Sequence, residues 1–473
     1  MKNFNSYFNR NFFLIFLICS FGLALRLYQI NFEDFWLDEQ ASFWVAEPSL
    51  LFEETVSRSY ELDNGTHIFF NFILKFFFNF FYYDPQIGRI IPLIFGFLSI
   101  PAISYLTFYI KKDKSYLFVA FLTSINFYLI SYSQELREYS LVFLLGILSI
   151  LFFYKTIDNL SSSKNKLVSS AFYILFSLIG LCTHIFFFII ILSQATYLFF
   201  TYFSEKKKLL FALMNIVFIL IFYIFLMFDI LILQMSINDH WIKNVELSFI
   251  FDLYFPRFFG SHIMGAIYLL VLLYLLILNK KTFFQYENKN FLLIILLFFS
   301  YLIPVIYGNI AIPVLTDRYI IYVLIPILIL ISNLIFDLKN KKVKFLILFL
   351  IITTTLINNY GEIFKRKISK PPFKLALENI LKSNTKNVFI KTPRQLIIGK
   401  IVNNHLEAIN LNNKYNILFE DKEHNLTNNN QFWLLCYKPI NSFNCSLDDS
   451  RSSLWKNSKK IKLHLLEATL YKK

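Results

Sequence analysis

Four acidic side chains lie close together directly after the first long apolar run of the sequence. They belong to the stretch Glu33-Asp34-Phe35-Trp36-Leu37-Asp38-Glu39. Ionised carboxylates are costly to remove from water, so we expect these to face water or a polar cavity just outside a bilayer. A carboxylate there can take a proton from a hydroxyl or amine, or stabilise positive charge that develops at a sugar carbon. We single out Asp38 and Glu39 as candidate catalytic residues; the alternative is a solvated loop whose acids only follow the topology.

A second polar cluster separates two later apolar runs. Its sequence is Ser131-Tyr132-Ser133-Gln134-Glu135-Leu136-Arg137-Glu138-Tyr139. Glu135 could orient an acceptor or assist Asp38, and the planar guanidinium of Arg137 could bind a phosphate. Taken alone, an ion pair between Glu135 and Arg137 that tightens a short loop is the simpler explanation.

Other polar side chains stand at the ends of apolar runs. His184 follows Cys182-Thr183, and a lone histidine in such a place is more often a hydrogen-bonded packing residue than a catalyst. Arg318 and Tyr319 open a run in which the cation could reach lipid headgroups or neutralise a lipid phosphate. Arg89 and Lys75 are weaker candidates of the same kind.

The sequence lacks the usual patterns for metals and soluble nucleotides. Its 7 His are scattered without a paired His motif on a helix, and it has no Gly-rich phosphate loop. With 11 Gly in all, a nucleotide-sugar donor in a Rossmann-like domain is not expected. We expect no cofactor, since no ligand spacing indicates a divalent cation, and a membrane-borne donor is the natural substitute.

The elements that must position these residues are membrane helices. The chain has 473 residues, 56% of them hydrophobic and 16% charged, with 59 Phe and 28 Tyr. Apolar runs of about 17 to 25 residues recur from Asn11 to Asn359, the length that a bilayer requires of a helix. We expect an α-helical polytopic membrane protein with about eleven spanning helices. Its net charge of +15 lies in the short links between runs, as in cytoplasmic loops, which argues against nucleic-acid binding.

The distribution of basic residues predicts the topology. Lys2 and Arg10 precede the first run, Asn11 to Ile30, so the N-terminus is expected inside and Asp38 outside. Acidic residues and no small-residue cleavage site follow this run, which favours a retained helix. The segment His67 to Tyr83 is interpreted as an interfacial or re-entrant helix on the outer side, because the later basic loops then all fall inside. The last span is Phe345 to Asn358, and the chain leaves it on the outer side.

A polar C-terminal region follows the last span. We divide the chain into a transmembrane domain, residues 1–359 with an outer loop at about 31–89, and an extracytoplasmic domain, residues 360–473. Short apolar patches at Asn387 to Ile390 and Phe432 to Leu435 predict β-strands, and Phe373 to Leu381 has helical spacing after Pro371-Pro372. A small α/β domain fits this pattern. Within it, Cys436 and Cys445 are either a disulfide or two free thiols.

The ordered set of motifs resembles a known family, the GT-C membrane glycosyltransferases. The resemblance is to the branch with protein O-mannosyltransferases and bacterial aminoarabinose transferases, which use polyprenyl-phosphate sugars. The motifs that carry it are, in order, Leu25-Arg26-Leu27, Phe35-Trp36-Leu37-Asp38-Glu39, Asp63-Asn64, Gly88-Arg89, Ser133 to Tyr139, Thr183-His184, Asp317-Arg318-Tyr319 and Pro326. The chain departs from the family after Asp63, where Gly65-Thr66-His67-Ile68 replaces a common Pro-Pro pair. The role of His67 as a substrate-binding candidate is therefore open.

The resemblance implies an inverting sugar transfer outside the cytoplasm. Asp38 matches the essential acid of the first loop, and Glu135 matches the acid of the second loop. Arg137, Tyr139 and Arg318 match residues near the donor phosphate or the cavity wall. His184 and Tyr319 complete the set of substrate-binding candidates.

The sequence therefore predicts a multi-pass glycosyltransferase. It would move a sugar from a polyprenyl-phosphate carrier to a lipid, glycan or protein acceptor on the outer side of a plasma membrane, most simply a bacterial inner membrane. The alternative is a transporter or flippase of lipid-linked saccharides, in which ionisable residues near the bilayer midplane and symmetric halves are expected. The acids gather on one side and the sequence shows no repeat, so the enzyme is favoured.

Overall fold

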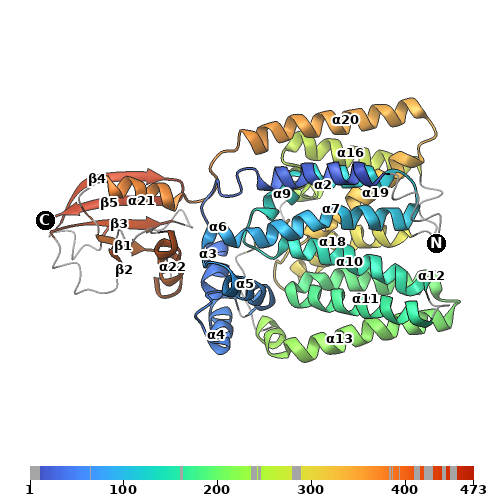
Figure 1. The fold of residues 1–473 in the computed structure, drawn as a ribbon, viewed down its shortest axis with the longest axis horizontal. Helices are drawn as coiled ribbons and strands as arrows, with labels where there is room; N and C mark the ends of the chain where they lie inside the picture. Colours follow the sequence, from blue (N-terminus) through green and yellow to red (C-terminus); the bar gives the residue numbers. More distant parts are fainter. Residues whose placement is uncertain are drawn as a thin grey trace. The chain divides into compact units, whose positions relative to one another are not determined.

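The computed structural model of this chain divides into two compact units (Figure 1). It describes residues 11–63, 65–159, 163–235, 242, 247–279, 289–382, 385, 387–393, 395–409, 416–419, 430–438, 444–447 and 455–473. The first unit, called here the helical unit, comprises residues up to 28, 92–134 and 138–366. The second, called the mixed unit, comprises residues 29–91, 135–137 and 367–473.

The helical unit is a bundle of apolar helices that run side by side in Figure 1. Its helices are α2 (Phe12–Leu27), α7 (Ile90–Lys111), α8 (Ser115–Ile125), α9 (Phe127–Ser133), α10 (Tyr139–Asp158), α11 (Ser163–Thr183), α12 (Phe188–Tyr202), α13 (Lys206–Met235), α14 (Leu247–Asp252), α15 (Phe255–Phe259), α16 (His262–Leu278), α18 (Asn290–Ile310), α19 (Leu324–Asp337) and α20 (Lys341–Asn359). The 18-residue apolar window of α10 is 83% buried and that of α13 only 17%. Apolar side chains that the protein does not bury suit a lipid-facing surface, so α10 is central and α13 peripheral.

Seven helices of the described part are long and apolar enough to cross a membrane. They are Pro85–Lys111, Tyr139–Asp158, Asn165–Thr183, Ile185–Tyr202, Lys206–Leu233, Asn290–Ile310 and Lys341–Phe364. The pair α8 and α9, bent by 57°, makes eight if it is one broken span. The multi-pass helical fold is confirmed. The count of about eleven stays a prediction, because it requires the shorter helices Phe12–Leu27, His262–Leu278 and Ile321–Asp337 to span as well.

A buried arginine explains how the helical unit tolerates the break between α8 and α9. Asn126 ends α8 and caps α9, since its side chain accepts a hydrogen bond from the N–H of Leu129. The break leaves main-chain carbonyls without helical partners, which is costly in an apolar environment. Arg26 of α2 donates to the carbonyls of Thr123 and Ser124, both at 3.1 Å, and to the Ser133 hydroxyl at 3.2 Å. The Leu25-Arg26-Leu27 motif thus stabilises a broken helix.

A five-stranded sheet forms the C-terminal part of the mixed unit. Its order is β2 (Asn416–Phe419), β1 (Asn387–Lys391), β3 (Gln431–Tyr437), β5 (Leu466–Lys472) and β4 (Lys456–Leu463). Strand β1 is parallel to β2 and β3, whereas β5 is antiparallel to β3 and β4. Helix α22 (Lys400–Ile409) follows β1 and precedes β2, as a crossover between parallel strands requires. The predicted small α/β region is confirmed.

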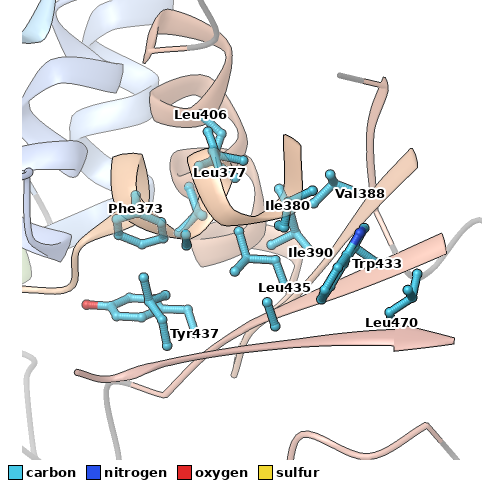
Figure 2. Close-up of a cluster of buried hydrophobic side chains, with 14 residues drawn as sticks. Phe373, Leu377, Ile380, Val388, Ile390, Leu406, Trp433, Leu435, Tyr437 and Leu470 are labelled. Atoms are coloured by element: carbon cyan, nitrogen blue, oxygen red, sulfur yellow. The ribbon is translucent and has the colours of Figure 1, made fainter. Parts of the chain in front are cut away.

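The core of this region lies between one face of the sheet and two helices (Figure 2). Phe373, Leu377 and Ile380 come from α21 (Phe373–Leu381), and Leu406 comes from α22. Alternate residues of the strands meet them, because successive side chains of a strand point to opposite faces: Val388 and Ile390 of β1, Trp433, Leu435 and Tyr437 of β3, and Leu470 of β5. Cys436 and Cys445 form a disulfide in this region. Of the two alternatives, a disulfide or two free thiols, the structure therefore shows the disulfide.

The mixed unit also contains the loop that follows the first helix. Its helices are α3 (Leu37–Val45), α4 (Phe52–Asp63), α5 (Ile68–Phe80) and α6 (Pro85–Gly88). Trp44 and Val45 of α3 form a buried cluster with Ile401 of α22. With 13 residues, α5 is shorter than a span, as expected for the segment His67 to Tyr83. The first loop and the sheet therefore share one core; the boundaries 1–359 and 360–473 stay predictions.

Candidate active site

The candidate acids are presented by the first turn of α3. Trp36 is its N-cap, so Asp38 and Glu39 are the second and third helical residues. Negative side chains are stabilised there by the free N–H groups and the helix dipole. Successive helical residues point about 100° apart. Glu39 is fully buried, whereas Asp38 keeps part of its side chain exposed.

Glu39 is the centre of a dense polar network within the mixed unit. Arg89 binds it with two groups, Nε to Oε1 and Nη2 to Oε2, both at 3.0 Å. The N–H of Leu136 donates to Oε1 at 2.9 Å, and Lys370 Nζ donates to Oε2 at 2.9 Å. Burial acts to raise the pKa of Glu39, but the charges of Arg89 and Lys370 and these hydrogen bonds outweigh it, so the pKa is lowered to about 2. Glu39 is therefore ionised at neutral pH.

Arg89 and Lys75, the weaker candidates, both contact the main chain. Arg89 Nη1 donates to the carbonyls of Ile30 at 2.9 Å and Glu33 at 2.7 Å. Lys75 Nζ donates to the carbonyls of Glu47 at 2.9 Å and Leu50 at 2.6 Å. These hydrogen bonds stabilise the conformation of the first loop.

The carboxylates of Glu33 and Asp34 bind the start of the C-terminal region. Glu33 Oε1 accepts hydrogen bonds from the N–H and hydroxyl of Ser369, at 2.5 and 2.7 Å, and from the N–H of Lys370 at 3.2 Å. Asp34 Oδ2 accepts from the N–H of Lys374 at 2.7 Å, in the first turn of α21. Two of the four acids thus anchor residues 369–374.

Lys370 is a site residue that the sequence analysis missed. Its ammonium group lies 2.9 Å from Glu39 Oε2 and 3.0 Å from Glu135 Oε1, and its side chain is 11% exposed. The same nitrogen lies 5.9 Å from the centroid of the Trp36 ring. Lys370 precedes Pro371-Pro372 and follows Glu135 by more than 200 residues, so nothing in the sequence indicated that the two side chains meet.

Asp38 lies beside Arg137 and Tyr437. Nη1 of Arg137 donates to the main-chain carbonyl of Asp38 at 3.3 Å and to the hydroxyl of Ser42 at 3.2 Å. Burial, together with the negative charge of Asp38, raises the pKa of Tyr437. The mixed unit therefore brings together four of the predicted residues, namely Asp38, Glu39, Glu135 and Arg137.

The remaining predicted residues lie elsewhere. His67, also in the mixed unit, is buried and is the N-cap residue of α5; Asn64 of the Asp63-Asn64 motif lies outside the described residues. Tyr139, His184, Arg318 and Tyr319 belong to the helical unit. There the His184 ring lies 4.9 Å from the Tyr319 ring and 6.3 Å from the Tyr139 ring, measured between centroids.

His184 contacts a neighbour in the chain and aromatic rings, and Arg318 contacts an aromatic ring. His184 Nδ1 accepts a hydrogen bond from the N–H of Phe186 at 3.2 Å and so caps a short 3₁₀ turn, Ile185–Phe187. The Arg318 guanidinium lies 5.8 Å from the Tyr319 ring. The capping contact fits the alternative of a hydrogen-bonded packing histidine.

A polar pocket of about 480 Å³ opens in the mixed unit, and Asp38 is not among its lining residues. It is lined by Trp44, Glu47, Arg58, Glu61, Lys400, Asn403, Asn404 and Glu407. In the described part of the chain, no group of three or more His, Cys, Asp or Glu residues could hold a metal ion.

Comparisons with known proteins give a likeness of fold. No family model and no curated protein matches the sequence. The crystal structure of ArnT from Cupriavidus metallidurans in the apo state matches over 98% of both chains, with a TM-score of 0.58 and 7% identity. The chain has the GT-C fold. ArnT bound to undecaprenyl phosphate matches over 96% of this chain and 97% of that one, with a TM-score of 0.58 and 8% identity.

An oligosaccharyltransferase has the GT-C fold as well. The Archaeoglobus fulgidus enzyme, in complex with Zn and sulfate, matches over 80% of this chain and 60% of its own, with a TM-score of 0.52 and 11% identity. The expected resemblance to GT-C proteins is thus confirmed at the level of fold, by structure where sequence identity is too low to carry it.

Proposed function

We propose that this protein is a membrane glycosyltransferase that takes its sugar from a polyprenyl-phosphate carrier. The observation that carries the proposal is the GT-C fold, shared with ArnT over 98% of both chains, with an acidic helix N-terminus in the first loop. ArnT has been crystallised with undecaprenyl phosphate, which supports a lipid-phosphate donor for the same fold here. The acceptor is a lipid, a glycan or a protein on the outer side of the membrane.

The reaction is a direct displacement at the anomeric carbon. The acceptor O–H gives its proton to the Asp38 carboxylate as the acceptor oxygen bonds to the anomeric carbon. The bond between that carbon and the phosphate oxygen breaks on the opposite side, and its electron pair leaves with the polyprenyl phosphate. A phosphate is a weakly basic leaving group, so cations that hold its charge suffice without a strong general acid. Inversion at the sugar follows.

The contacts of the mixed unit support different roles for its two candidate acids. Glu39 receives hydrogen bonds from three residues and stays ionised, so it supports the loop instead of exchanging a proton. Asp38, in the same turn and partly exposed, is the proton acceptor. Arg137 and Arg318 are the candidates to hold the phosphate, Glu135 assists, and Tyr139, His184, Tyr319 and His67 are the other substrate-binding candidates.

A transfer assay with defined donors tests the proposal. Purified protein is incubated with a panel of radiolabelled polyprenyl-phosphate sugars and membrane extract, and labelled acceptor is separated from donor. The expected result is transfer from at least one donor, with release of polyprenyl phosphate. Translocation of a lipid-linked saccharide across vesicles without any transfer would instead support the transporter or flippase.

A further inference from the structure

One lysine joins two carboxylates that come from distant parts of the sequence. Lys370 Nζ lies 2.9 Å from Glu39, in the first turn of α3, and 3.0 Å from Glu135, in the link between α9 and α10. Arg89 does not take its place, because its Nε and Nη2 bind Glu39 and its Nη1 binds two main-chain carbonyls. Lys370 is therefore a cation that the two acids share.

The main chain around Lys370 is held as firmly as its side chain. The buried Glu33 carboxylate accepts the N–H groups of Ser369 and Lys370, and Asp34 accepts the N–H of Lys374. Three backbone hydrogen bonds thus fix the segment that carries the ammonium group. A side chain whose support is fixed in this way can hold its partners in one geometry.

Loss of this cation would remove the bridge between the two acids. Glu39 is fully buried and the Glu135 side chain is 16% exposed. Without Lys370, Glu39 keeps Arg89 and the N–H of Leu136 but loses the bridge to Glu135, so the two side chains would move apart. Because Asp38 directly precedes Glu39 in the same helical turn, a shift of Glu39 moves Asp38 as well.

We propose that Lys370 is a positioning residue, which locks Glu39 and Glu135 together and thereby fixes the geometry of Asp38. The C-terminal region thus contributes a residue to the site in addition to packing against the loop. The inference rests on the proposed glycosyltransferase function. Lys370 contacts carboxylates of the protein in this arrangement, and its effect on transfer passes through them.

The test compares Lys370→Met with Lys374→Met in the full-length protein. Methionine keeps the apolar stem of lysine and removes its charge. Lys374 is a matched control, because its side chain is exposed and its N–H, which the substitution keeps, makes the contact with Asp34. We expect Lys370→Met to lower kcat by up to roughly 10²-fold, as misplaced catalytic groups do, with KM for the donor little changed. Lys374→Met should transfer sugar at the wild-type rate, and Lys370→Arg should recover most of the activity.

Two further measurements test the positioning role of Lys370. The double variant Lys370→Met/Glu135→Gln removes one charge of each sign. Its loss of activity should therefore be smaller than the combined losses of the two single variants. Hydrogen exchange of residues 37–45 should be faster in Lys370→Met than in Lys374→Met, whether or not any donor is turned over. A wild-type protein that transfers no sugar would overturn the proposed function while this exchange result stands. Unchanged kcat and unchanged exchange in Lys370→Met, or a loss confined to the donor KM, would overturn the positioning role.

Discussion

The four acids after the first helix differ in their surroundings more than in their sequence. Glu33 and Asp34 bind the main chain of residues 369–374, and Glu39 is buried between Arg89 and Lys370. Asp38 is partly exposed at the N-terminus of α3. A proton acceptor must be reachable by its substrate. Asp34 is also partly exposed but binds the N–H of Lys374, so at the residue scale we propose Asp38 as the acceptor.

Replacement of the Asp38 carboxylate by an amide should abolish most of the transfer. Asp38→Asn keeps the size of the side chain and removes its charge and basicity, so we expect turnover to fall by roughly 10²-fold or more. Binding of the donor lipid should persist, because it depends on the polyprenyl chain and on phosphate contacts. Initial-rate assays with the donor found in the panel measure the first effect, and donor binding measures the second.

Glu53→Gln is the matched control for this change. It makes the same replacement of a carboxylate in the same loop, at an exposed position of α4, and should transfer sugar normally. An Asp38→Asn protein that folds and turns over at the wild-type rate would remove Asp38 from the mechanism.

His405 gives the mixed unit a specific dependence on pH. The ring is 1% exposed, stacks on Phe35 at 5.5 Å, and finds no hydrogen-bond partner for either nitrogen among the described residues. Burial lowers its pKa from 6.5 to about 3. The unfolded chain therefore binds the proton more strongly, so stability is full above about pH 6.5 and falls as the pH drops towards 3.

His405→Phe should remove this component of the pH dependence. Between pH 7 and pH 5 the wild-type protein should lose about 2 kcal/mol of unfolding free energy through His405, since one pKa unit corresponds to about 1.4 kcal/mol. The apparent Tm in detergent, measured at both pH values, should shift less in His405→Phe than in wild type. His464→Gln, at an exposed turn, should shift as wild type does. Equal shifts in all three proteins would contradict the assignment.

At the element scale, the sequence predicted segments whose signals are local. Helix α21 has the predicted bounds, Phe373–Leu381, because a proline pair precedes an amphipathic repeat. Strands β1 and β3 contain the two predicted apolar patches. Strand β4, Lys456–Leu463, was not predicted, since its lysine-rich edge carries no apolar alternation. The network around Glu39 could not be predicted either, because Lys370 reaches it through a fold whose pairings are distant in sequence.

The close contact between α7 and α9 requires a glycine at position 96. A Cβ atom added to Gly96 would lie 2.8 Å from Ser133 Cβ and 3.3 Å from Arg26 Nε, and would overlap the Ser133 hydroxyl. Gly96→Ala must therefore displace the Ser133 side chain, whose hydroxyl accepts a hydrogen bond from Arg26. We expect a loss of about 1 to 3 kcal/mol, as in other overpacked cores.

Gly361→Ala is the control, because no described residue beyond its helical neighbours lies within 4 Å of the added atom. It should keep the Tm of the wild-type protein in detergent, whereas Gly96→Ala should lower it. Identical melting of both variants would mean that α7 can move away from α9 without cost.

At the scale of the whole molecule, composition and the length of the apolar runs predicted the class of protein, whereas the orientation inferred from the lysines stays a prediction. The grouping of the first loop with the C-terminal region was not accessible in the same way. It depends on Trp44 and Val45 packing with Ile401 and on Glu33 binding residue 369, contacts between segments more than 300 residues apart. No periodicity of a single segment encodes such a pairing, so one sequence cannot reveal it.

The first loop and the C-terminal region share one core, which constrains the topology. Two segments that pack in one compact unit must lie on the same side of the membrane, and the charge distribution predicts that this is the outer side. The disulfide between Cys436 and Cys445 agrees, since disulfides persist in oxidising compartments. A background of Cys19→Ala and Cys182→Ala removes the two buried free thiols and keeps this disulfide.

Single cysteines in this background test the orientation with a membrane-impermeant maleimide. Glu53→Cys in the first loop and Lys382→Cys after α21 are exposed positions, and both should be labelled in intact cells. Lys207→Cys, in a basic link expected inside, should be labelled only after the cells are permeabilised. Because the first loop and the C-terminal region share one core, labelling of one without the other would contradict their packing in the mixed unit. Protection of both, with Lys207→Cys labelled, would invert the topology and move Asp38 to the cytoplasmic side.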